Sequence, residues 1–374
     1  MTEVRAAFVM EQTLGHITHH RNLELAVARQ SRVRPTWVPV PYPTRGLERL
    51  VPGYATNWTI RASYRARREL DRVLATRPHQ ALFFHTQVTS LFSVGLMRRI
   101  PTIVSLDATP INYDSVGRAY GHRPASGSRL DERKHRLNRS VFDAARALVT
   151  WSEWARDSLV RDYGVAPGKI NVLAPGAAPA YFEVGRDRVH NLRSGDPVRI
   201  LFVGGDFVRK GGPLLLDAIR DLRTRNPFEL HLVTNADVAP QPGVTVHRNV
   251  APNSPQLLRL FSAAHVFALP SSAECLSIAL MEAAAAALPI LTTDVGALSE
   301  VAGDGDNALA IAAGDREALR SALARMIDDD LLRRRLGLAS LALARKKFSA
   351  EDNDRAILDL IAEIAVASGD RIVA

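Results

Sequence analysis

Short apolar runs alternate with helix-length segments along the whole chain. In the first half, the runs that we expect to be strands are Ala6–Met10, Thr36–Pro41, Ala81–His85, Thr102–Leu106, Ala147–Trp151 and Ile170–Leu173. In the second half they are Val198–Val203, Glu229–Thr234, Val244–His247, His265–Leu269, Ile290–Thr293 and Ala308–Ile311. This alternation predicts parallel sheets with crossover helices. We therefore expect an α/β protein with two doubly wound parallel sheets.

The segment between the two sets of strands has the composition of a linker. Residues 174–179 read Ala-Pro-Gly-Ala-Ala-Pro, and a polar run continues to Asp196. We place the boundary near residue 185, which gives domains at 1–185 and 186–350. The amphipathic stretch within 351–374 predicts a terminal helix, which we expect to pack back towards the N-terminal domain. Ligands of open parallel sheets bind outside the carboxyl ends of the strands, so two such domains would face each other across a cleft.

Composition narrows the class of protein. A chain of 374 residues with 47% hydrophobic and 23% charged residues is typical of a globular protein with two domains. Cys275 is the only cysteine, so no internal disulfide can form and a reducing compartment is expected. No apolar run is long enough to span a membrane, and the first residues lack a signal-peptide layout. We expect a cytoplasmic protein.

The positive charge is concentrated in the first half of the chain. Of the net +9, residues 1–150 carry 23 Lys and Arg against 11 Asp and Glu, a net +12, which leaves −3 for the rest. Nucleic acid is not the expected partner, because no aromatic residues interleave with this charge and no reading helix is recognisable. An anionic acceptor or an anionic membrane surface, at the inner face of the membrane, fits better. The basic amphipathic stretch 57–77 would suit membrane contact, although the same pattern fits a surface helix packed on its own sheet.

Two glutamates flank a predicted helix start in the second half. The strand His265–Leu269 leads into a loop that holds Glu274, and an Ala-rich helix opens near Ser277 and contains Glu282. Their eight-residue spacing corresponds to roughly 12 Å along a helix axis, which matches an extended nucleotide-sugar. The helix N-terminus between them favours a diphosphate. By themselves the two acids would also fit a solvated loop residue and a polar position on a buried helix.

A glycine-rich loop follows the strand Val198–Val203. It begins with Gly204 and Gly205 and contains Arg209 and Lys210 before a helix that opens near residue 213. The loop is neither a dinucleotide fingerprint nor a P-loop, because the required glycine and Gly-Lys-Ser/Thr orders are missing. Flexible glycine N–H groups beside two cations still suit a phosphate. As isolated residues, the two cations would equally fit solvated surface charges.

Taken together, these motifs resemble the retaining nucleotide-sugar glycosyltransferases of family 4, whose GT-B fold consists of two facing Rossmann-like domains. The stretch 203–211 resembles the family's Val-Gly to Lys-Gly segment, and 269–301 resembles its Glu-x7-Glu signature. Residues 151–176 resemble the family's approach to the linker. The resemblance implies that Glu274 faces the transferred sugar and Glu282 the ribose. It also implies that the diphosphate or sugar is held by Arg209, Lys210 and the backbone N–H groups of Cys275, Leu276 and Ser277.

The chain departs from the family pattern in three places. The loop after Glu274 reads Cys-Leu-Ser where the family usually has Gly-Phe-Gly. Gly205 stands where a cation usually follows Val-Gly, so we expect Arg209 to substitute. Asp107 aligns with a histidine that contacts the transferred sugar in many members. Asp107 would accept a hydrogen bond from a sugar hydroxyl or position the acceptor. Alternatively, it would only cap the end of its strand.

Further candidates lie in the first half. Gly15 follows the first strand, where family members hold a glycine-rich loop against the diphosphate. Candidates on the acceptor side, chosen by position alone, are His16, His19, His85, Tyr113 and His122. The spacing of His16, His19 and His20 includes no carboxylate or cysteine that would complete a metal site. We read the acidic runs 304–306 and 328–330 as turn or cap residues and expect no metal or other cofactor.

The resulting hypothesis is a retaining transfer of a sugar from a nucleoside-diphosphate sugar to an acceptor hydroxyl. In this reaction, cationic side chains take the place of a metal ion. The leaving diphosphate would be stabilised by Arg209, Lys210 and the helix N-terminus near Ser277. The acceptor would be a glycan or a lipid-linked molecule in cell-surface glycan or glycolipid synthesis. Two other functions use the same fold: a nucleotide-sugar epimerase and a non-catalytic nucleotide-sugar-binding subunit. The altered loop after Glu274 is the feature that favours the last of these.

Overall fold

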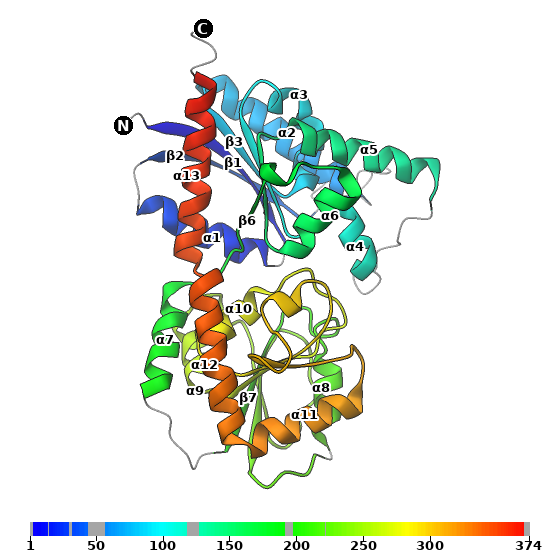
Figure 1. The fold of residues 1–374 in the computed structure, drawn as a ribbon, viewed down its shortest axis with the longest axis vertical. Helices are drawn as coiled ribbons and strands as arrows, with labels where there is room; N and C mark the ends of the chain where they lie inside the picture. The colour runs from blue at the N-terminus through cyan, green and yellow to red at the C-terminus, as the bar shows by residue number, and fades with distance from the viewer. Residues whose placement is uncertain are drawn as a thin grey trace. The chain divides into compact units, whose positions relative to one another are not determined.

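The computed structural model describes residues 3–13, 15–29, 32–43, 57–117, 127–190, 197–220 and 222–369 (Figure 1). The chain divides into two compact units. We call the first, Met1–Tyr113 with Ala125–Ala174 and Asp352–Ala374, the N-terminal unit. The second, Asp114–Pro124 with Pro175–Glu351, is the C-terminal unit.

The N-terminal unit is built on a six-stranded parallel sheet in the order β2-β1-β3-β4-β5-β6. Its strands are β1 (Val4–Gln12), β2 (Val33–Pro41), β3 (Ala81–His85), β4 (Thr102–Leu106), β5 (Ala147–Thr150) and β6 (Ile170–Val172). Its main helices are α1 (His16–Ala28), α2 (Trp58–Thr76), α3 (Val94–Met97), α5 (Arg129–Ala144) and α6 (Glu153–Tyr163), with α4 (Pro110–Val116) after β4. The predicted strands are confirmed, with ends that shift by a few residues.

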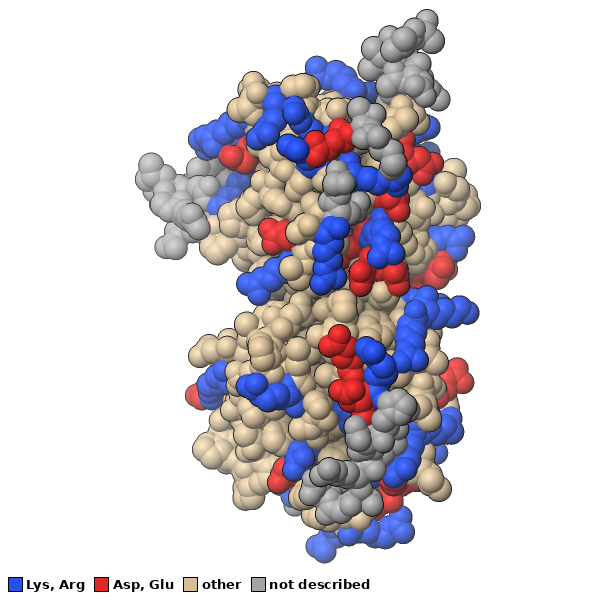
Figure 2. Space-filling model, turned by 90° about the vertical axis from the view of Figure 1, so that its left-hand side faces the viewer, with Lys and Arg blue, Asp and Glu red and all other residues tan. Residues whose placement is uncertain are grey.

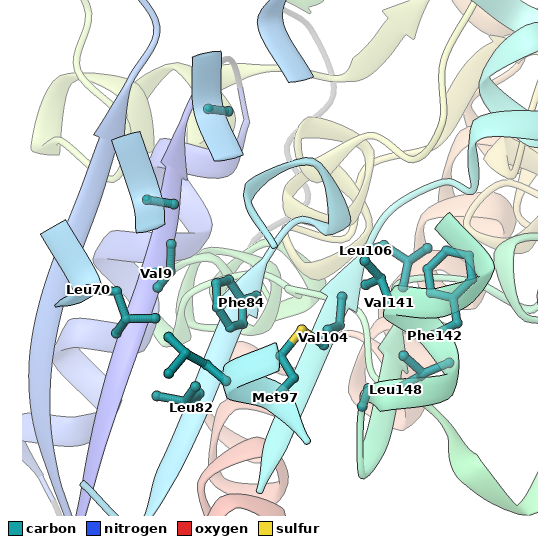
Figure 3. Close-up of a cluster of buried hydrophobic side chains, with 14 of the residues drawn as sticks. Val9, Leu70, Leu82, Phe84, Met97, Val104, Leu106, Val141, Phe142 and Leu148 are labelled. Atoms are coloured by element: carbon teal, nitrogen blue, oxygen red, sulfur yellow. The ribbon is translucent and has the colours of Figure 1, made fainter. Parts of the chain in front are cut away.

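Two apolar layers cover this sheet because successive strand residues point to opposite faces. On one face, Val9 and Phe84 pack with α2 and α5 through Leu70 and Phe142 (Figure 3). On the other face, the next residues along β1 pack with α1 and with α13 (Ala350–Gly369), which contributes Ile357, Leu358, Ile361, Ile364 and Ala365. The terminal helix therefore supplies part of the core of the N-terminal unit.

The C-terminal unit has a second six-stranded parallel sheet, in the order β12-β11-β10-β7-β8-β9. Its strands are β7 (Val198–Val203), β8 (Phe228–Val233), β9 (Val244–His247), β10 (Val266–Leu269), β11 (Ile290–Thr293) and β12 (Ala308–Ile311). Its helices are α7 (Pro179–His190), α8 (Gly212–Arg220), α9 (Pro255–Ala263), α10 (Ile278–Ala285), α11 (Arg316–Asp328) and α12 (Asp330–Lys347). All six predicted strands are confirmed.

Helix α10 lies at the centre of close helix packing. A Cβ added to Gly185 of α7 would meet the carbonyl oxygen of Ala285 at 2.2 Å, and one on Gly337 of α12 would meet that of Ala287 at 2.4 Å. The alanines of α10 and these glycines let three backbones approach closely. As a result, α10 is buried along almost its whole length.

One guanidinium closes the C-terminal ends of two helices in this unit. Arg188 of α7 donates to the carbonyl oxygens of Phe261 (2.5 Å), Ser262 (3.2 Å) and Ala264 (2.6 Å) at the end of α9, and to that of Ala286 (2.9 Å) at the end of α10. The last carbonyls of a helix lack partners within the helix and attract a positive charge. Burial lowers the pKa of Arg188 to about 10, which leaves the guanidinium charged at neutral pH.

The boundary between the units differs from the predicted position near residue 185. The C-terminal unit begins at Pro175, because the segment before α7 is already held by that unit. The Ala177 N–H donates to the Phe348 carbonyl oxygen (2.8 Å), and the Ala350 N–H donates to the Ala177 carbonyl oxygen (3.1 Å). The composition of the linker predicts the segment but not these backbone bonds. The chain returns to the N-terminal unit near its end, and the residues from Asp352 onwards belong to that unit.

The predicted basic helix forms as α2, with the Asn57 side chain accepting from the Ile60 N–H at its start. Several of its charges are paired locally, including Arg67 with Asp71 (2.9 Å). On the face shown in Figure 2, Lys and Arg side chains interleave with Asp and Glu side chains. Among the described residues, no helix has the length and apolar character needed to cross a bilayer.

Candidate functional site

The glycine-rich loop after β7 packs closely around the side chain of Lys210. A Cβ on Gly204 would lie 2.7 Å from the Lys210 side chain and 2.9 Å from the Phe202 ring. Gly211 has φ of +81°, and a Cβ there would lie 1.9 Å from the Pro270 carbonyl oxygen. Only glycine fits these two positions without displacement of the loop. The loop is thereby held against the segment that follows β10.

Three charged side chains meet at the carboxyl edge of the C-terminal sheet. The Lys210 ammonium lies 2.5 Å from Oε1 of Glu274, and Nη1 of Arg209 lies 3.0 Å from the same oxygen. Arg209 also donates to the Ala273 carbonyl oxygen (2.7 Å) and to Asp206 (2.9 Å). The sequence places these residues on two loops far apart, and the structure brings them together as predicted neighbours of one site. Arg209 and Glu274 are each about 5% exposed, so their charges stabilise each other with little screening.

The loop after Glu274 approaches the N-terminus of α10 with its polar groups turned inward. Gly296 has φ of +58°, and a Cβ there would lie 1.8 Å from the Glu274 carbonyl oxygen, so the loop packs directly on this turn. The Ala297 N–H donates to the Cys275 carbonyl oxygen (2.9 Å). Cys275, Leu276 and Ser277 are all buried. The Ser277 hydroxyl precedes α10 and has no hydrogen-bond partner within the described part of the chain.

Glu282 lies one turn into α10 and is almost fully buried. Burial raises the pKa of Glu282 to about 8, while the Tyr181 hydroxyl and the positive charge of Lys210 lower it. Burial and the nearby carboxylate also raise the pKa of Tyr181. Lys210 therefore bonds to one glutamate of the Glu-x7-Glu pair and acts electrostatically on the other.

A group of aromatic and imidazole rings lies at the carboxyl edge of the N-terminal sheet. Nδ1 of His16 lies 2.8 Å from Nε2 of His85, and the Trp151 ring stacks on His85 with ring centroids 5.3 Å apart. His19 completes the group, with its ring 4.9 Å from His85, and Nδ1 of His19 lies 3.9 Å from Oδ1 of Asp354. The structure thus brings together three of the predicted acceptor-side residues.

Burial keeps the imidazoles of His19 and His85 neutral. It lowers the pKa of His19 to about 3, with smaller contributions from the charges of His16 and His20. The pKa of His85 is also well below its usual value, mainly because of burial. The same effect raises the pKa of the Asp354 carboxyl well above its usual range. The N-terminal polar group therefore offers neutral hydrogen-bonding rings at neutral pH.

Asp107 lies directly after β4, close to the same group. Burial and the charge of Glu11 raise the pKa of Asp107, whereas His16 and two backbone N–H groups lower it. Glu11 at the end of β1 is buried and accepts from the Trp58 indole (2.9 Å) and the Thr86 hydroxyl (2.6 Å). Sequence reasoning missed Glu11, although a carboxylate at the carboxyl end of the first strand was a visible signal.

The other predicted positions are more scattered. Gly15 precedes the first residue of α1 and is exposed, and Gly205 faces open space in its loop. Tyr113 is half-buried in α4. His122 lies outside the described residues. Tyr181 and Trp151 are buried site residues that the pattern of the chain did not single out.

The acidic runs act as predicted in turns and caps. Asp329 accepts from the Leu332 N–H (2.9 Å) at the start of α12, and Asp304 accepts from the Ala310 N–H (2.9 Å). In the part of the chain that the structure describes, no three His, Cys, Asp or Glu side chains converge with metal-binding geometry.

Comparison with known protein families assigns both units to one class. Residues 21–181 match the profile of "Glycosyltransferase Family 4", and residues 197–329 match that of "Glycosyl transferases group 1". With its two six-stranded parallel sheets, the chain has the GT-B fold, and each unit matches a glycosyltransferase family model over part of its length.

Curated relatives share part of their length with this chain. A "D-inositol 3-phosphate glycosyltransferase" of Corynebacterium diphtheriae is 27% identical over 269 residues, which cover 64% of this chain and 63% of the relative. An "MMP alpha-(1->4)-mannosyltransferase" of Mycolicibacterium hassiacum is 30% identical over 201 residues, 51% of this chain and 47% of the relative. The matched segments thus span less than two thirds of these relatives.

Solved structures share the fold over almost the whole chain. Sucrose-phosphate synthase from Thermosynechococcus elongatus superposes with a TM-score of 0.75 at 16% identity, covering 98% of this chain and 100% of that structure. HepE from Anabaena, in complex with UDP and glucose, has a TM-score of 0.67 at 12% identity, covering 96% and 100%. At these identities the likeness shows the fold.

Proposed function

We propose that the chain transfers a sugar from a nucleoside-diphosphate sugar to an acceptor hydroxyl, with retention at the anomeric carbon. The observation that carries this proposal is the convergence of Lys210, Arg209 and Glu274 beside the N-terminus of α10. A buried ion pair next to a helix N-terminus is suited to the charge of a diphosphate. Relatives that are named as glycosyltransferases, and a GT-B structure that contains UDP, support the same donor class.

In this proposal the two glutamates hold opposite ends of the donor. Both cations contact Oε1 of Glu274, which fixes the position of this buried carboxylate. Glu274 would accept a hydrogen bond from a hydroxyl of the transferred sugar. Glu282 would accept from the ribose hydroxyls. Of the two carboxylates, Glu274 is the one that the cations hold in a fixed position.

In this proposal the site must stabilise the negative charge of the leaving diphosphate. As the bond to the anomeric carbon breaks, negative charge grows on the diphosphate oxygens. Arg209, Lys210 and the α10 N–H groups stabilise that charge without a divalent metal. The leaving phosphate accepts the proton of the acceptor hydroxyl, which attacks on the same face and so retains the configuration. Measurement of the anomeric configuration of the product by NMR tests retention directly.

The acceptor would bind to the N-terminal unit. His16 and His85 offer ring nitrogens, and Asp107 offers a carboxyl group, at the carboxyl edge of that sheet. The excess positive charge of residues 1–150 favours an acceptor that carries phosphate or another anion. We infer a glycan or lipid-linked acceptor, and the relative named for inositol 3-phosphate supports an anionic one.

We infer that the protein works in the cytoplasm and contacts anionic membranes through the N-terminal unit. Ile60 and Tyr64 on α2 and Phe92 next to it are 40–50% exposed, and Arg67 donates to the Phe92 carbonyl oxygen. Exposed apolar residues beside cations suit a lipid surface. Co-sedimentation with phosphatidylglycerol vesicles should fall in the triple variant I60S/Y64S/F92S; unchanged binding would contradict this contact.

The first test is a thermal-shift screen of the full chain against UDP, GDP, ADP and their common sugar conjugates. Selective binding to the folded state stabilises it by about 2.7 kcal/mol when the free ligand is at about 100 times its Kd. We expect one nucleotide to raise Tm selectively, and we expect Lys210→Ala to abolish that rise.

Lys346→Ala provides the matched control, because Lys346 is exposed in the last turn of α12, outside the site. This variant should keep the full nucleotide response. Absence of a shift with every nucleotide would contradict the proposal. An equal loss in both lysine variants would show a general charge effect instead of a donor site.

A further inference from the structure

An open cavity of about 990 Å³ lies in the N-terminal unit, at the amino edge of its sheet. Its lining includes Pro101 before β4, Ala147 at the start of β5 and Lys169 before β6. His85 and Asp107 lie at the carboxyl ends of the strands, which is the opposite edge of the sheet. The cavity is therefore separate from the site described above, and it is open to solvent, with Arg98, Arg99 and Arg146 all exposed.

Three arginines line this cavity without side-chain partners. Arg98, Arg99 and Arg146 make no side-chain hydrogen bond and no ion pair within the described part of the chain. Lys169, in contrast, donates to the carbonyl oxygens of Phe142 (2.6 Å) and Asp143 (2.9 Å) at the end of α5. The lysine thus satisfies a helix terminus, and the three guanidinium groups remain available to a ligand.

The lining holds two carboxylates against four cations, so it keeps a net positive charge. The Asp143 carboxylate lies 3.8 Å from Arg139, and its charge also acts on Lys169. Glu363 is the second carboxylate of the lining, and it forms no ion pair with the arginines. Burial lowers the pKa of Lys169, the charge of Asp143 raises it, and the charge of Arg146 lowers it by a smaller amount. An anion beside the three arginines would gain favourable electrostatic interactions with their charges.

Part of the lining is apolar. Leu360 and Ile364 of α13 and Met97 of α3 contribute to it, and Met97 and Ile364 are buried. Guanidinium groups bind phosphate oxygens in a bidentate manner, whereas aliphatic side chains favour a hydrocarbon group. The cavity combines both surfaces in one unit of the protein.

We propose that this cavity binds a phosphate ester that carries an apolar group, with the phosphate against Arg98, Arg99 and Arg146 and the apolar group against α13. A membrane lipid and a soluble amphiphilic phosphate share this chemistry. The site is independent of the donor site, and its occupancy does not require the proposed transfer reaction.

The test compares two triple variants of the full chain by calorimetry with monomeric dihexanoyl phosphatidic acid. R98Q/R99Q/R146Q removes the cavity arginines, whereas R129Q/R133Q/R136Q removes three exposed arginines of α5 that do not line the cavity. The two variants have the same net charge. We expect the cavity variant to bind about tenfold more weakly or worse, because it loses charge-assisted contacts, and the control to bind like the wild type. Glu363→Gln should tighten binding, since it removes the nearby negative charge.

Two further arms identify the source of the ligand. Selective loss of binding to phosphatidylglycerol vesicles in the cavity variant would assign the site to a membrane lipid. Selective loss for the monomeric phosphate alone would assign it to a soluble ligand. Equal affinity in both triple variants, or a response to inorganic phosphate as strong as to the amphiphile, would overturn the proposal. A preserved melting temperature and nucleotide response in the cavity variant separate this result from misfolding and from failure of the donor site.

Discussion

Burial acts on both units of the protein, but with opposite consequences for pH. In the N-terminal unit, burial lowers the pKa of His19 to about 3 and so favours the neutral imidazole. In the C-terminal unit, burial raises the pKa of Glu282 to about 8 and so favours the neutral acid. The first group destabilises the fold as the pH falls, and the second does so as the pH rises. Each unit thus has its own pH window.

The two units also differ in how they keep charge. In the C-terminal unit, the buried carboxylate of Glu274 lies next to two cations, Arg209 and Lys210, which belong to the loop after β7. In the N-terminal unit, the buried His19 and His85 are neutral, and several of their nitrogens have no hydrogen-bond partner among the described residues. Fixed charge suits a step in which charge develops, whereas neutral rings suit recognition of hydroxyl groups. The difference agrees with a donor in one unit and an acceptor in the other.

The largest effect should come from Lys210→Ala. In the proposed reaction, loss of this ammonium removes one preorganised charge partner of the leaving diphosphate, and turnover should fall by about 10² or more. Steady-state transfer assays with the nucleotide-sugar identified by thermal shift measure this. Near wild-type turnover in Lys210→Ala would contradict this contrast between the two units, because the paired charges of the C-terminal unit would then have no part in the reaction.

Arg188→Ala tests a cation with a structural role in the C-terminal unit. The substitution leaves the carbonyl oxygens at the ends of α9 and α10 without their donor, which should cost about 2–4 kcal/mol of unfolding free energy. Urea denaturation measures it. Arg186→Ala is the matched control, because Arg186 is exposed on the same helix. Equal effects of the two substitutions would show that helix propensity, not the carbonyl contacts, determines the result.

His19→Gln tests the neutral state of the N-terminal group. Between about pH 3 and 6.5 the unfolded state binds a proton at His19 and the folded state does not, so wild-type stability falls as the pH falls through this window. One group contributes at most about 1.4 kcal/mol per pH unit. Unfolding free energies of the variant should show a shallower acid limb. Between pH 7 and 8 His19 is neutral in both states, so the two slopes should agree there; a parallel acid limb would mean that His19 is charged in the folded protein.

Much of the fold follows from local patterns in the sequence. Ala81–His85 and Thr102–Leu106 are short apolar runs next to helical segments, and both form strands with the predicted bounds. The order of the motifs also places Lys210 and Glu274 at the same edge of one sheet, since both loops follow parallel strands. Local pattern and the carboxyl-edge rule are enough for these features.

Other features depend on contacts between distant residues. Tyr181 influences Glu282, and Arg188 reaches the ends of two helices, yet neither residue belongs to a motif with a readable spacing. The unit boundary at Pro175 depends on backbone bonds between Ala177 and the segment before α13. Such contacts arise when helices pack, so composition near the linker does not predict them.

Glu282→Gln should give the smallest effect, with a sign opposite to that of His19→Gln. Between pH 4.5 and about 8 the folded state binds a proton at Glu282 and the unfolded state releases it, so wild-type stability falls as the pH rises. The variant should lose this slope. Lys210 and Tyr181 moderate the pKa shift, which narrows the pH window over which stability falls compared with that of a fully isolated acid.

The same residue links the pH dependence to the donor. If Glu282 accepts from the ribose hydroxyls as a carboxylate, nucleotide binding must release its proton, and affinity should rise with pH up to about 8 in the wild type. Calorimetric titration at several pH values measures this in the wild type and in Glu282→Gln, whose affinity should be weaker and independent of pH in the same range. A wild-type affinity that stays constant from pH 6 to 8 would contradict a carboxylate role, because a protonated Glu282 would then bind the nucleotide equally well. The C-terminal unit would in that case resemble the N-terminal unit, in which neutral buried groups make the contacts.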